Sequence, residues 1–571
     1  MREVIFELIT TYGVDEPYFD DIISNQSADM AISDIIDLMK YRLDSSNIYS
    51  ARIKATALIS KIAEVHAQEN EILNGDVLAL VECKRYEEAL DSTKNMLPFP
   101  FAIIAKVTDL LTYEMLESEV TKLVRDNIGN RWIFRIADVD DTPLKIVPKL
   151  LEKINGKRSI FVEKTAVRLD FTHSGWSDIF FLSTDFPEGA KVINMAIDLC
   201  EYKEKSTKPP ITVSLRVIDK PVLRLKSVDL NCEQEISDFD EMFRLKDCPL
   251  SILKAAVIAA GLVPPFINSG KNQSFTKLLE YLIGKGMGLE IVSSVDTIPP
   301  NSRLAVSTNL LASIITLLMR ATNQITIFEG ELVDATQEKL IMSRVTLAEW
   351  LGGSSGGWQD TGGILGGVKA FSGELSDVLG GARGKLLPQY ERLCLKNDVK
   401  RNLLADMVLV HGGMSINVSN TLKDVTNKYL VREKSAATAR KGLIEKYAEL
   451  QKAILVCAGK EIAAITDSIF SNELQEIIPY VTNKYTETIR ENMQKEFGND
   501  YYGFMMIGGL SGGGMVFWVN GEQTDRYKRV ESVLLNSQCE CEGEFDFVSP
   551  PIVYNFEINE KGTVGFLKYE E

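Results

Sequence analysis

The chain has 571 residues, of which 45% are hydrophobic and 25% charged, and its formal net charge is −17 at pH 7. That length exceeds a single hydrophobic core and predicts about three or four domains. The negative net charge argues against a protein built mainly to bind nucleic acid. With only three histidines, a histidine-rich metal site or a Ser-His-Asp hydrolase is also not favoured.

Residues 1–157 are predicted to form a helical domain. In "NIYSARIKATALISKIAEVHAQEN", apolar residues recur at steps of three and four, and "FPFAIIAKVTDLLTYEMLESEVTKLVRDNI" repeats the pattern. No catalytic constellation is visible there. We therefore expect helical packing or the binding of a protein partner.

The protein is expected to be cytoplasmic and not membrane-bound. No apolar run is long enough to cross a bilayer, and the start, "MREVIFELITTYGVDEPYFDD", has acidic residues where a signal peptide needs an apolar stretch. The eight cysteines are scattered along the chain, which favours a reduced state.

From residue 158 the sequence pattern changes, and both strands and helices are predicted. Strands are predicted in "RSIFVEKTAVRLDF", "AKVINMAIDLCEYKE", "PPITVSLRVID" and "ADMVLVHGG", and buried helices in "PLSILKAAVIAAGLV" and "TNLLASIITLLMRATNQ". Two long helical stretches are expected at about 431–498. The chain is then predicted to close on a hairpin, with its turn at 559–562. Without strict alternation of strand and helix, the fold class is α+β.

The stretch "GGSSGGWQDTGGILGG" at 352–367 raises two alternatives. Such a density of glycine and serine is typical of a flexible linker. A tryptophan inside a long apolar-patterned region favours instead a structured loop whose glycines permit close backbone approach.

Four segments, taken together, favour the structured loop. They are "VRLDFTHSGWSD", "DTIPPNSRLAVSTNLLAS", "LAEWLGGSSGGWQDTGGILGG" and "MMIGGLSGGGMVFWV". In this order they resemble the GHMP small-molecule kinases, and within them the L-fucokinase and heptose kinase branch. The first resembles R-x-D-L-A-G-G-W-T-D with one extra residue, and the third is similar to E-x8-W-Q-D-x-x-G-G. The likeness covers about residues 158–571.

The resemblance implies a two-lobed fold and a reaction. The fold would have a ribosomal-protein-S5-like lobe at 158–370 and a ferredoxin-like lobe at 371–571, after the helical domain. The reaction would be ATP- and Mg²⁺-dependent transfer of a phosphoryl group to a sugar hydroxyl, which needs positioning, charge neutralisation and a proton acceptor.

The resemblance also assigns residues to roles. Asp360 would be the base, Asp178 the sugar-binding acid, and Arg168 the basic residue that holds the nearby loop. The sugar would be bound by residues from the first and third segments, namely Gly175, Trp176, Asp178, Trp358 and Gln359. Trp176 could equally well be packed in the core. Asp360 could instead cap a helix, and Glu349 could be an ordinary exposed residue of a helix. Glu349 would hold Mg²⁺ with a hydroxyl from Ser307 or Thr308.

The nucleotide loop departs from the family pattern. The family has P-x-G-S-G-L-G-T-S-S, whereas Asn301, Arg303 and Ala305 stand here where three glycines are expected. Arginine or alanine at positive φ costs about 1 kcal/mol or more. Arg303 could compensate by reaching a phosphate, or the loop could be degenerate. The residues assigned to the nucleotide are Asn301, Ser302, Arg303, Leu304, Ala305, Val306, Ser307, Gly512 and Gly513.

Three hypotheses remain from the sequence. The first is a sugar kinase that makes a sugar 1-phosphate or a related phospho-sugar. The second is a catalytically weak or dead protein of this fold that binds a ligand and acts through partners, which the altered loop and the additional helical domain suggest. The third is another enzyme on the fold, such as a decarboxylase, against which Glu349 weighs.

Overall fold

The computed structural model describes residues 137–139, 144–154, 156–171, 191–245, 248–264, 274–299, 302, 304–352, 358–372, 388–414, 434–507 and 513–569. Most of the predicted helical domain, through residue 136, lies outside these residues. The described chain mixes strands and helices in two eight-stranded sheets. Every described ladder is antiparallel except the one between β6 and β8, which agrees with the α+β prediction.

The first sheet has the strand order β7-β6-β8-β5-β2-β16-β9, with β1 paired to β2. Its strands are β1 (Lys153–Ile154), β2 (Lys157–Thr165), β5 (Ile211–Ile218), β6 (Leu223–Ser227), β7 (Cys232–Ile236), β8 (Gly288–Val295), β9 (Gly330–Glu331) and β16 (Thr563–Tyr569). Burial alternates strictly along β5, so one face of the sheet is packed and the other is half open.

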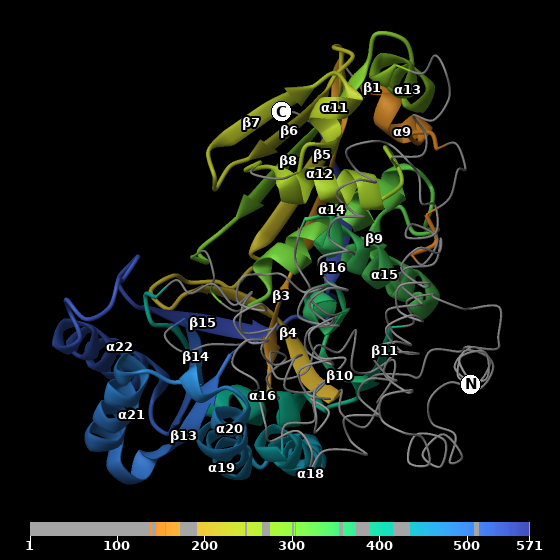
Figure 1. The fold of residues 1–571 in the computed structure, drawn as a ribbon. Coiled ribbons are helices and arrows are strands. Elements are labelled where there is room, and N and C mark those ends of the chain that lie inside the picture. Colours follow the sequence, from red (N-terminus) through yellow and green to blue (C-terminus); the bar gives the residue numbers. More distant parts are fainter. Residues whose placement is uncertain are drawn as a thin grey trace, which may run out of the picture.

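Helices cover the packed face. α14 (Val306–Ala321) lies against β2 and β5, and α12 (Ser251–Ala259) and α15 (Ala335–Leu351) pack on α14. α14 is buried from Thr308 to Ala321, as expected for a helix that is apolar nearly all round. Short helices complete this layer: α9 (Pro148–Leu151), α11 (Phe239–Phe243) and α13 (Phe275–Leu282). Figure 1 shows β5–β8 with α11–α14 in its upper part.

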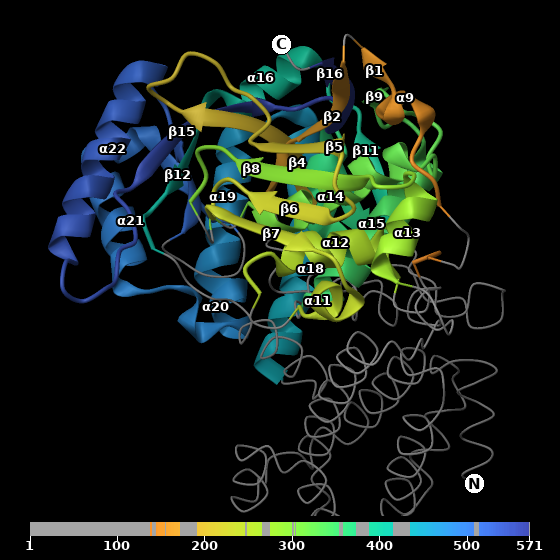
Figure 2. The same cartoon turned by 90° about the horizontal axis from the view of Figure 1, so that it is seen from above.

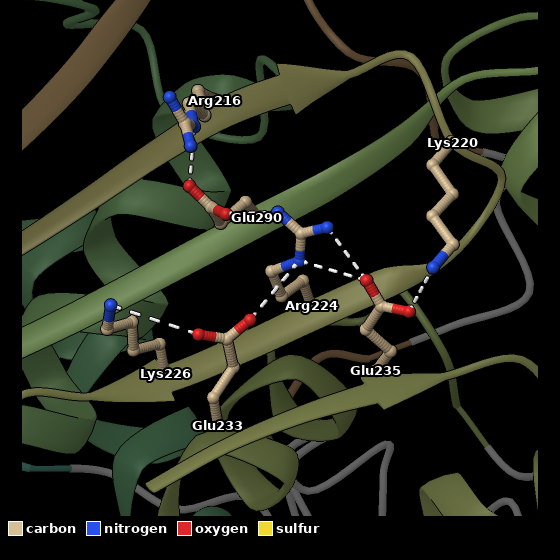
Figure 3. A network of polar contacts seen from close by, with 7 residues as sticks. All are labelled: Arg216, Lys220, Arg224, Lys226, Glu233, Glu235 and Glu290. Atoms are coloured by element: carbon tan, nitrogen blue, oxygen red, sulfur yellow. Dashed lines mark hydrogen bonds and ion pairs between the residues drawn. The ribbon is translucent and has the colours of Figure 1, made fainter. Parts of the chain in front are cut away.

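The open face of the first sheet carries charged side chains in a chain of ion pairs (Figure 3). Arg224 Nη1 lies 2.8 Å from Glu290 Oε2 and its Nη2 lies 2.7 Å from Glu235 Oε1. Arg216 contacts the other oxygen of Glu290. Burial alone would raise the pKa of Glu290, but Arg216 and Arg224 hold it below its usual value. These ion pairs keep charged side chains on the face of the sheet that is open to water.

The second sheet has the order β11-β10-β4-β15-β12-β14-β13, with β3 paired to β4. Its strands are β3 (Val167–Asp170), β4 (Lys191–Glu201), β10 (Val368–Ser372), β11 (Gln389–Leu393), β12 (Met407–His411), β13 (Tyr501–Met506), β14 (Gly514–Val519) and β15 (Ile552–Ile558). α19 (Gly459–Ile469) packs on β13, and α18 (Lys434–Val456) reaches β4. Figure 2 shows α21 (Lys484–Phe497) and α22 (Gln523–Glu540) at one end of the molecule and α9 and α13 at the other.

The helical region at 431–498 contains three long helices, not the predicted two. They are α18 (Lys434–Val456), α19 (Gly459–Ile469) and α21 (Lys484–Phe497). α18 and α19 are separate because the chain reverses at Cys457, which has φ 57°. A π-helical turn at Phe470–Leu474 and a short helix, α20 (Gln475–Ile477), follow. The remaining described helices are α16 (Asn397–Ala405) and α22 (Gln523–Glu540).

The predicted hairpin at the end of the chain is wrong. β15 pairs with β4 and β12 in the second sheet, whereas β16 pairs with β2 and β9 in the first. The turn at 559–562 therefore carries the chain from one sheet to the other. Its residue types suit a tight turn, but β15 and β16 pair in different sheets. The periodicity within each strand carries no information about its partners.

The division of residues 158–571 into two lobes at residue 370 stays a prediction. Each sheet takes strands from both sides of that position. The residues before the predicted boundary at 157 contact the body of the molecule: Ile146 N donates to Leu282 O over 2.9 Å, and Val147 N to Ala321 O over 2.9 Å. Among the helices of the described residues, none combines the length and apolarity needed to cross a bilayer.

Candidate active site

Arg168, Asp170 and Asp360 form the charged centre of the site. Arg168 and Asp170 lie two positions apart on β3 and so share one face of the strand. Arg168 Nη1 lies 2.6 Å from Asp170 Oδ2, and Nη2 donates to Asp360 Oδ1. The side chain of Asp170 is fully buried, and that of Asp360 is 16% exposed. Asp360 is therefore the carboxylate of this group that reaches the surface.

The electrostatics of the group favour a fixed guanidinium. Burial alone would lower the pKa of Arg168, but the carboxylates of Asp170 and Asp360 raise it above its ordinary value. A planar guanidinium shared by two carboxylates has a defined orientation. Arg168, which is fixed on β3, thus holds the carboxylate of Asp360 in place.

Asp360 lies in a turn of 3₁₀ helix that spans Trp358–Ile364, so the glycine-rich stretch is ordered here. Its glycines allow close packing. A Cβ at Gly362 would lie 2.5 Å from Asn194 Oδ1, and one at Gly363 would lie 2.2 Å from the carbonyl oxygen of Ala166. These positions are described parts of the predicted loop, and they fit the structured alternative rather than the linker.

The amino end of α14 lies directly beside this turn. Asn309 Nδ2 donates to Ala305 O over 2.9 Å and to Asp360 O over 3.0 Å, and Asn309 Oδ1 accepts from Gly363 N over 2.9 Å. Arg168 N donates to Leu304 O over 3.3 Å. One asparagine and one backbone bond therefore join three segments of the sequence.

Ala305 takes the conformation predicted for a glycine. It is the N-cap of α14, with φ 52° and ψ 42° in the left-handed region, and it makes no side-chain capping bond. The first amides of a helix have no partner inside the helix, so those of 306–308 face outward from its positive end. Val306 is half-buried, and Ser307 is exposed. This is a suitable position for an anionic group.

Glu349 lies near the carboxyl end of α15, next to the first turn of α14. Its Oε1 accepts from the Thr308 hydroxyl over 2.7 Å, and each residue is 5% exposed. Magnesium binds through one or two protein oxygens together with phosphate oxygens and water. The Glu349 and Thr308 oxygens fit such an ion. In the described part of the chain, no cluster of three His, Cys, Asp or Glu side chains forms a fuller metal cage.

The fourth segment meets the predicted nucleotide loop. Gly513 is buried, and a Cβ at Gly514, the first residue of β14, would lie 2.4 Å from the carbonyl oxygen of Ser302. Ser302 and Leu304 are both buried. The glycine at the start of β14 thus permits the loop to pass directly over the strand.

Several predicted site residues lie outside the described residues. These are Gly175, Trp176, Asp178, Asn301, Arg303 and Gly512. Trp358 is described only through its backbone. The Gln359 side chain is 3% exposed, and the Gln359 carbonyl oxygen accepts from Asn194 Nδ2 over 3.0 Å. The roles given to these residues remain predictions.

Four residues at the site were not predicted from the sequence: Asp170, Asn194, Asn309 and Lys369. Asp170 stands inside the R-x-D segment, and its spacing from Arg168 on a strand was a usable signal. Asn309 lies in the first turn of a predicted helix. Asn194 and Lys369 gave no local signal, because their partners are backbone carbonyls, which no residue type marks in the sequence.

Comparison with known proteins gives a structural likeness and no sequence match. No family model matches the chain, and no curated protein matches it. Solved structures that resemble it include GHMP-family kinases. A D-glycero-D-manno-heptose 1-phosphate kinase from Bacteroides thetaiotaomicron is 16% identical, with 72% of this chain and 100% of that chain covered and a TM-score of 0.45.

Two further structures have similar values. Galactokinase from Lactococcus lactis, complexed with galactose, is 14% identical over 71% of this chain and 95% of its own, with a TM-score of 0.45. Phosphomevalonate kinase from Streptococcus pneumoniae, in complex with phosphomevalonate and AMPPNP, is 10% identical over 69% and 99%, with a TM-score of 0.44. At such values the likeness transfers no substrate and no residue role.

Proposed function

We propose that the protein is an ATP- and Mg²⁺-dependent sugar kinase that transfers the γ-phosphoryl group of ATP to a sugar hydroxyl. The single observation that carries this proposal is the junction at Asn309. This side chain bonds Ala305 at the predicted nucleotide loop and Asp360 at the predicted base. A phosphate donor and a proton acceptor are both required within reach of one hydroxyl, and this junction supports both.

In this proposal, Asp360 takes the proton from the sugar hydroxyl as the new bond to phosphorus forms. Its Oδ1 is engaged by Arg168, so Oδ2 is the oxygen that would face the hydroxyl. The buried ion pair with Asp170 keeps Arg168 from turning toward the substrate. A base fixed in this way supports proton transfer through position as much as through basicity.

The nucleotide phosphates would lie at the amino end of α14. The amides that follow Ala305 and the helix dipole both favour an anion there. Glu349, with Thr308 or Ser307, would hold Mg²⁺, which neutralises phosphate charge when bound. Arg303, which is proposed to reach a phosphate with its guanidinium, would add to this charge balance.

The finer assignment follows the sequence resemblance. It gives an L-fucokinase-like reaction with a sugar 1-phosphate as product, and it places the sugar against Gly175, Trp176, Asp178, Trp358 and Gln359. Pocket shape distinguishes fucose from other sugars, and the motifs carry no information on it. The sugar class is therefore proposed, and its identity is left to the experiment.

The second candidate is a catalytically weak or dead protein of the same fold with a ligand-binding or regulatory role. The observation that favours it is Ala305, which keeps a glycine-like conformation at a cost that glycine would avoid. A loop under selection for turnover is expected to keep glycine at such a position.

A panel of free sugars with ATP and Mg²⁺, scored for ADP release, tests the proposal. One sugar that raises ADP release well above the sugar-free rate, and loses this effect in Asp360→Asn, is the expected result. Calorimetry of ATP–Mg²⁺ binding distinguishes the candidates if no sugar responds. Binding without turnover supports the second candidate, and no binding contradicts the kinase.

A further inference from the structure

A row of polar side chains crosses the second sheet directly beneath the Asp360 turn. In the ladder registers, Asp170 of β3 pairs with Asn194 of β4, and Asn194 pairs with Lys369 of β10. Residues in register share one face of a sheet. All three side chains are fully buried. This row stands where a strand would ordinarily present apolar side chains to the core.

Lys369 directs its ammonium group at the backbone of the site segment. Nζ lies 2.8 Å from Gly362 O, 2.6 Å from Leu365 O and 2.9 Å from Gly367 O. An ammonium group has three N–H donors, and each finds one carbonyl here. A neutral amine would have only two donors and would turn a lone pair toward the third oxygen. The three acceptors therefore match the ammonium form.

This arrangement carries an energetic penalty. Lysine is almost never fully buried without a charged partner, and here no carboxylate lies within ion-pair distance among the described residues. Burial lowers the pKa of Lys369 well below its ordinary value, and Arg392 acts in the same direction, while Asp170, Glu338 and Glu560 oppose both. A polar group kept buried at such a position is expected to do something that an apolar side chain could not.

Neighbouring side chains hold the rest of the segment. Asn194 bonds Gln359 O, and Asn309 bonds Asp360 O and Gly363 N. Lys369 holds the carboxyl-terminal half of the segment, which then ends where Gly367 N donates to Asn559 O over 2.8 Å. Without Lys369, the carbonyls of Gly362 and Leu365 would lose this buried donor, whereas Gly367 O would keep the bond from Ala196 N over 3.1 Å.

We propose that Lys369 is a positioning residue, which fixes the backbone of residues 360–367 through three carbonyl oxygens and thereby sets Asp360 opposite Arg168. The effect on the backbone follows from the contacts alone. The effect on catalysis rests on the proposed kinase function. A displacement of about 1 Å at a reacting group can lower a rate by about 100-fold, so a loosened segment should act mainly on kcat.

Hydrogen exchange of the full chain tests the structural claim without any assumption about activity. Lys369→Met keeps the length of the side chain and removes the donors. The amides of Gly363 and Gly367, both hydrogen-bonded, are expected to exchange about tenfold faster or more, since local opening sets their protection. Lys369→Gln retains two donors and should give a smaller increase.

A second buried lysine provides a matched control. Lys254 of α12 is 1% exposed, and its Nζ donates to Glu241 O over 2.9 Å and to Arg244 O over 3.3 Å, away from the Asp360 turn. Lys254→Met removes the same chemistry elsewhere. It is expected to speed exchange near 241–244 and to leave Gly363, Gly367 and the rate of ADP release unchanged.

The kinetic arm follows with the sugar that the panel identifies. Lys369→Met is expected to lower kcat by about 10- to 100-fold with little change in KM for ATP, and Lys369→Gln to recover part of the loss. Unchanged exchange at Gly363 and Gly367 would overturn the proposal. So would recovery of both Lys369 variants as unfolded protein while Lys254→Met folds, because Lys369 would then support the whole fold. Faster exchange in a protein that shows no kinase activity would leave Lys369 as a positioning residue and count against the proposed function instead.

Discussion

Arg168 donates a hydrogen bond to Asp360, which lies 192 positions later in the sequence, and the two residues belong to different elements of secondary structure. Arg168 lies on a buried strand, whereas Asp360 lies in a 3₁₀ turn that reaches the surface. The strand fixes the guanidinium, and the guanidinium fixes one oxygen of the carboxylate. This pair is the basis of the first prediction.

Asp360→Asn is expected to abolish phosphoryl transfer while sugar and nucleotide binding stay within a few-fold of the parent. The amide can still accept a hydrogen bond from Arg168, so the turn should persist. It cannot take up the proton of the hydroxyl, which should lower the rate by about 10²–10⁴. Steady-state kinetics with calorimetry for each ligand provide the measurement.

Asp219→Asn is the control for this variant. Asp219 is an exposed carboxylate paired with Arg158 and Lys153, outside the site. Its loss should leave turnover at the parent level. Parent-like turnover in Asp360→Asn as well would remove Asp360 from the mechanism.

Glu349→Gln is expected to raise the Mg²⁺ concentration needed for half-maximal activity. The variant keeps a hydrogen-bond acceptor for Thr308 but loses the charge that a magnesium ion favours. A magnesium titration of ADP release measures the effect. Glu338→Gln is the control, because Glu338 is also buried on α15 but is bonded by Tyr390 and Arg392. It should lower stability without altering the magnesium dependence, and a parent-like titration in Glu349→Gln would contradict the assignment.

The sequence predicted best those elements whose own pattern of apolar residues shows which positions are buried. α14 is apolar nearly all round and β5 alternates strictly, so each was visible from its own pattern. The pairing of β15 and β16 was not visible in this way. Two short strands joined by a tight turn look like a hairpin, and only their partners, which come from distant parts of the sequence, place them in different sheets.

The same distinction applies to the site. Asp360 and Glu349 stood out because the resemblance marks residue types at fixed spacing. Asn194 acts through a backbone carbonyl more than a hundred positions away. Lys369 acts through backbone carbonyls of the segment that directly precedes it. A side chain that serves backbone atoms leaves no partner residue type to search for. Such supports emerge only from the folded chain.

The pH dependence of stability should carry a contribution from Asp198 on β4. Burial raises the pKa of this carboxyl from 3.8 to about 6, with Glu557 acting in the same direction and the bond from Asn559 opposing. Between these values the native state binds a proton that the unfolded state has lost. The free energy of unfolding from this group is therefore fully present below about pH 4 and is lost as pH rises through about 6.

Asp198→Asn removes that titration. The amide resembles the protonated carboxyl, and its oxygen can still accept from Asn559 Nδ2. Near pH 4 the variant should match the parent, and at pH 7 it should be more stable by about 2 kcal/mol after allowance for solvent screening. Urea unfolding at both pH values measures this. Asp219→Asn should show the opposite sign, because Arg158 and Lys153 lower the pKa of Asp219. A difference between Asp198→Asn and the parent that does not change with pH would contradict the assignment.

The left-handed conformation of Ala305 predicts that glycine stabilises the fold there. Ala305 has φ 52°, which costs alanine about 1 kcal/mol or more relative to glycine. Ala305→Gly should therefore raise the free energy of unfolding by about 0.5–1 kcal/mol, even though glycine loses more entropy on folding. Ala312→Gly, in the middle of the same helix, should lower it instead. Destabilisation by Ala305→Gly would mean that the loop is not strained at this position.

The loop also decides between the two candidate functions. If Arg303 replaces the phosphate contacts of lost glycines, Arg303→Ala should weaken ATP by about 1.5–3 kcal/mol, as for a charge-assisted hydrogen bond, and adenosine much less. Restoring glycine at 301, 303 and 305 together tests the opposite view, because backbone amides could again face the phosphates. Calorimetry with ATP and adenosine, and ADP release, provide the readouts. Unchanged affinity and turnover in Arg303→Ala, with gains in both for the triple glycine variant, would favour a weakened kinase over an active one.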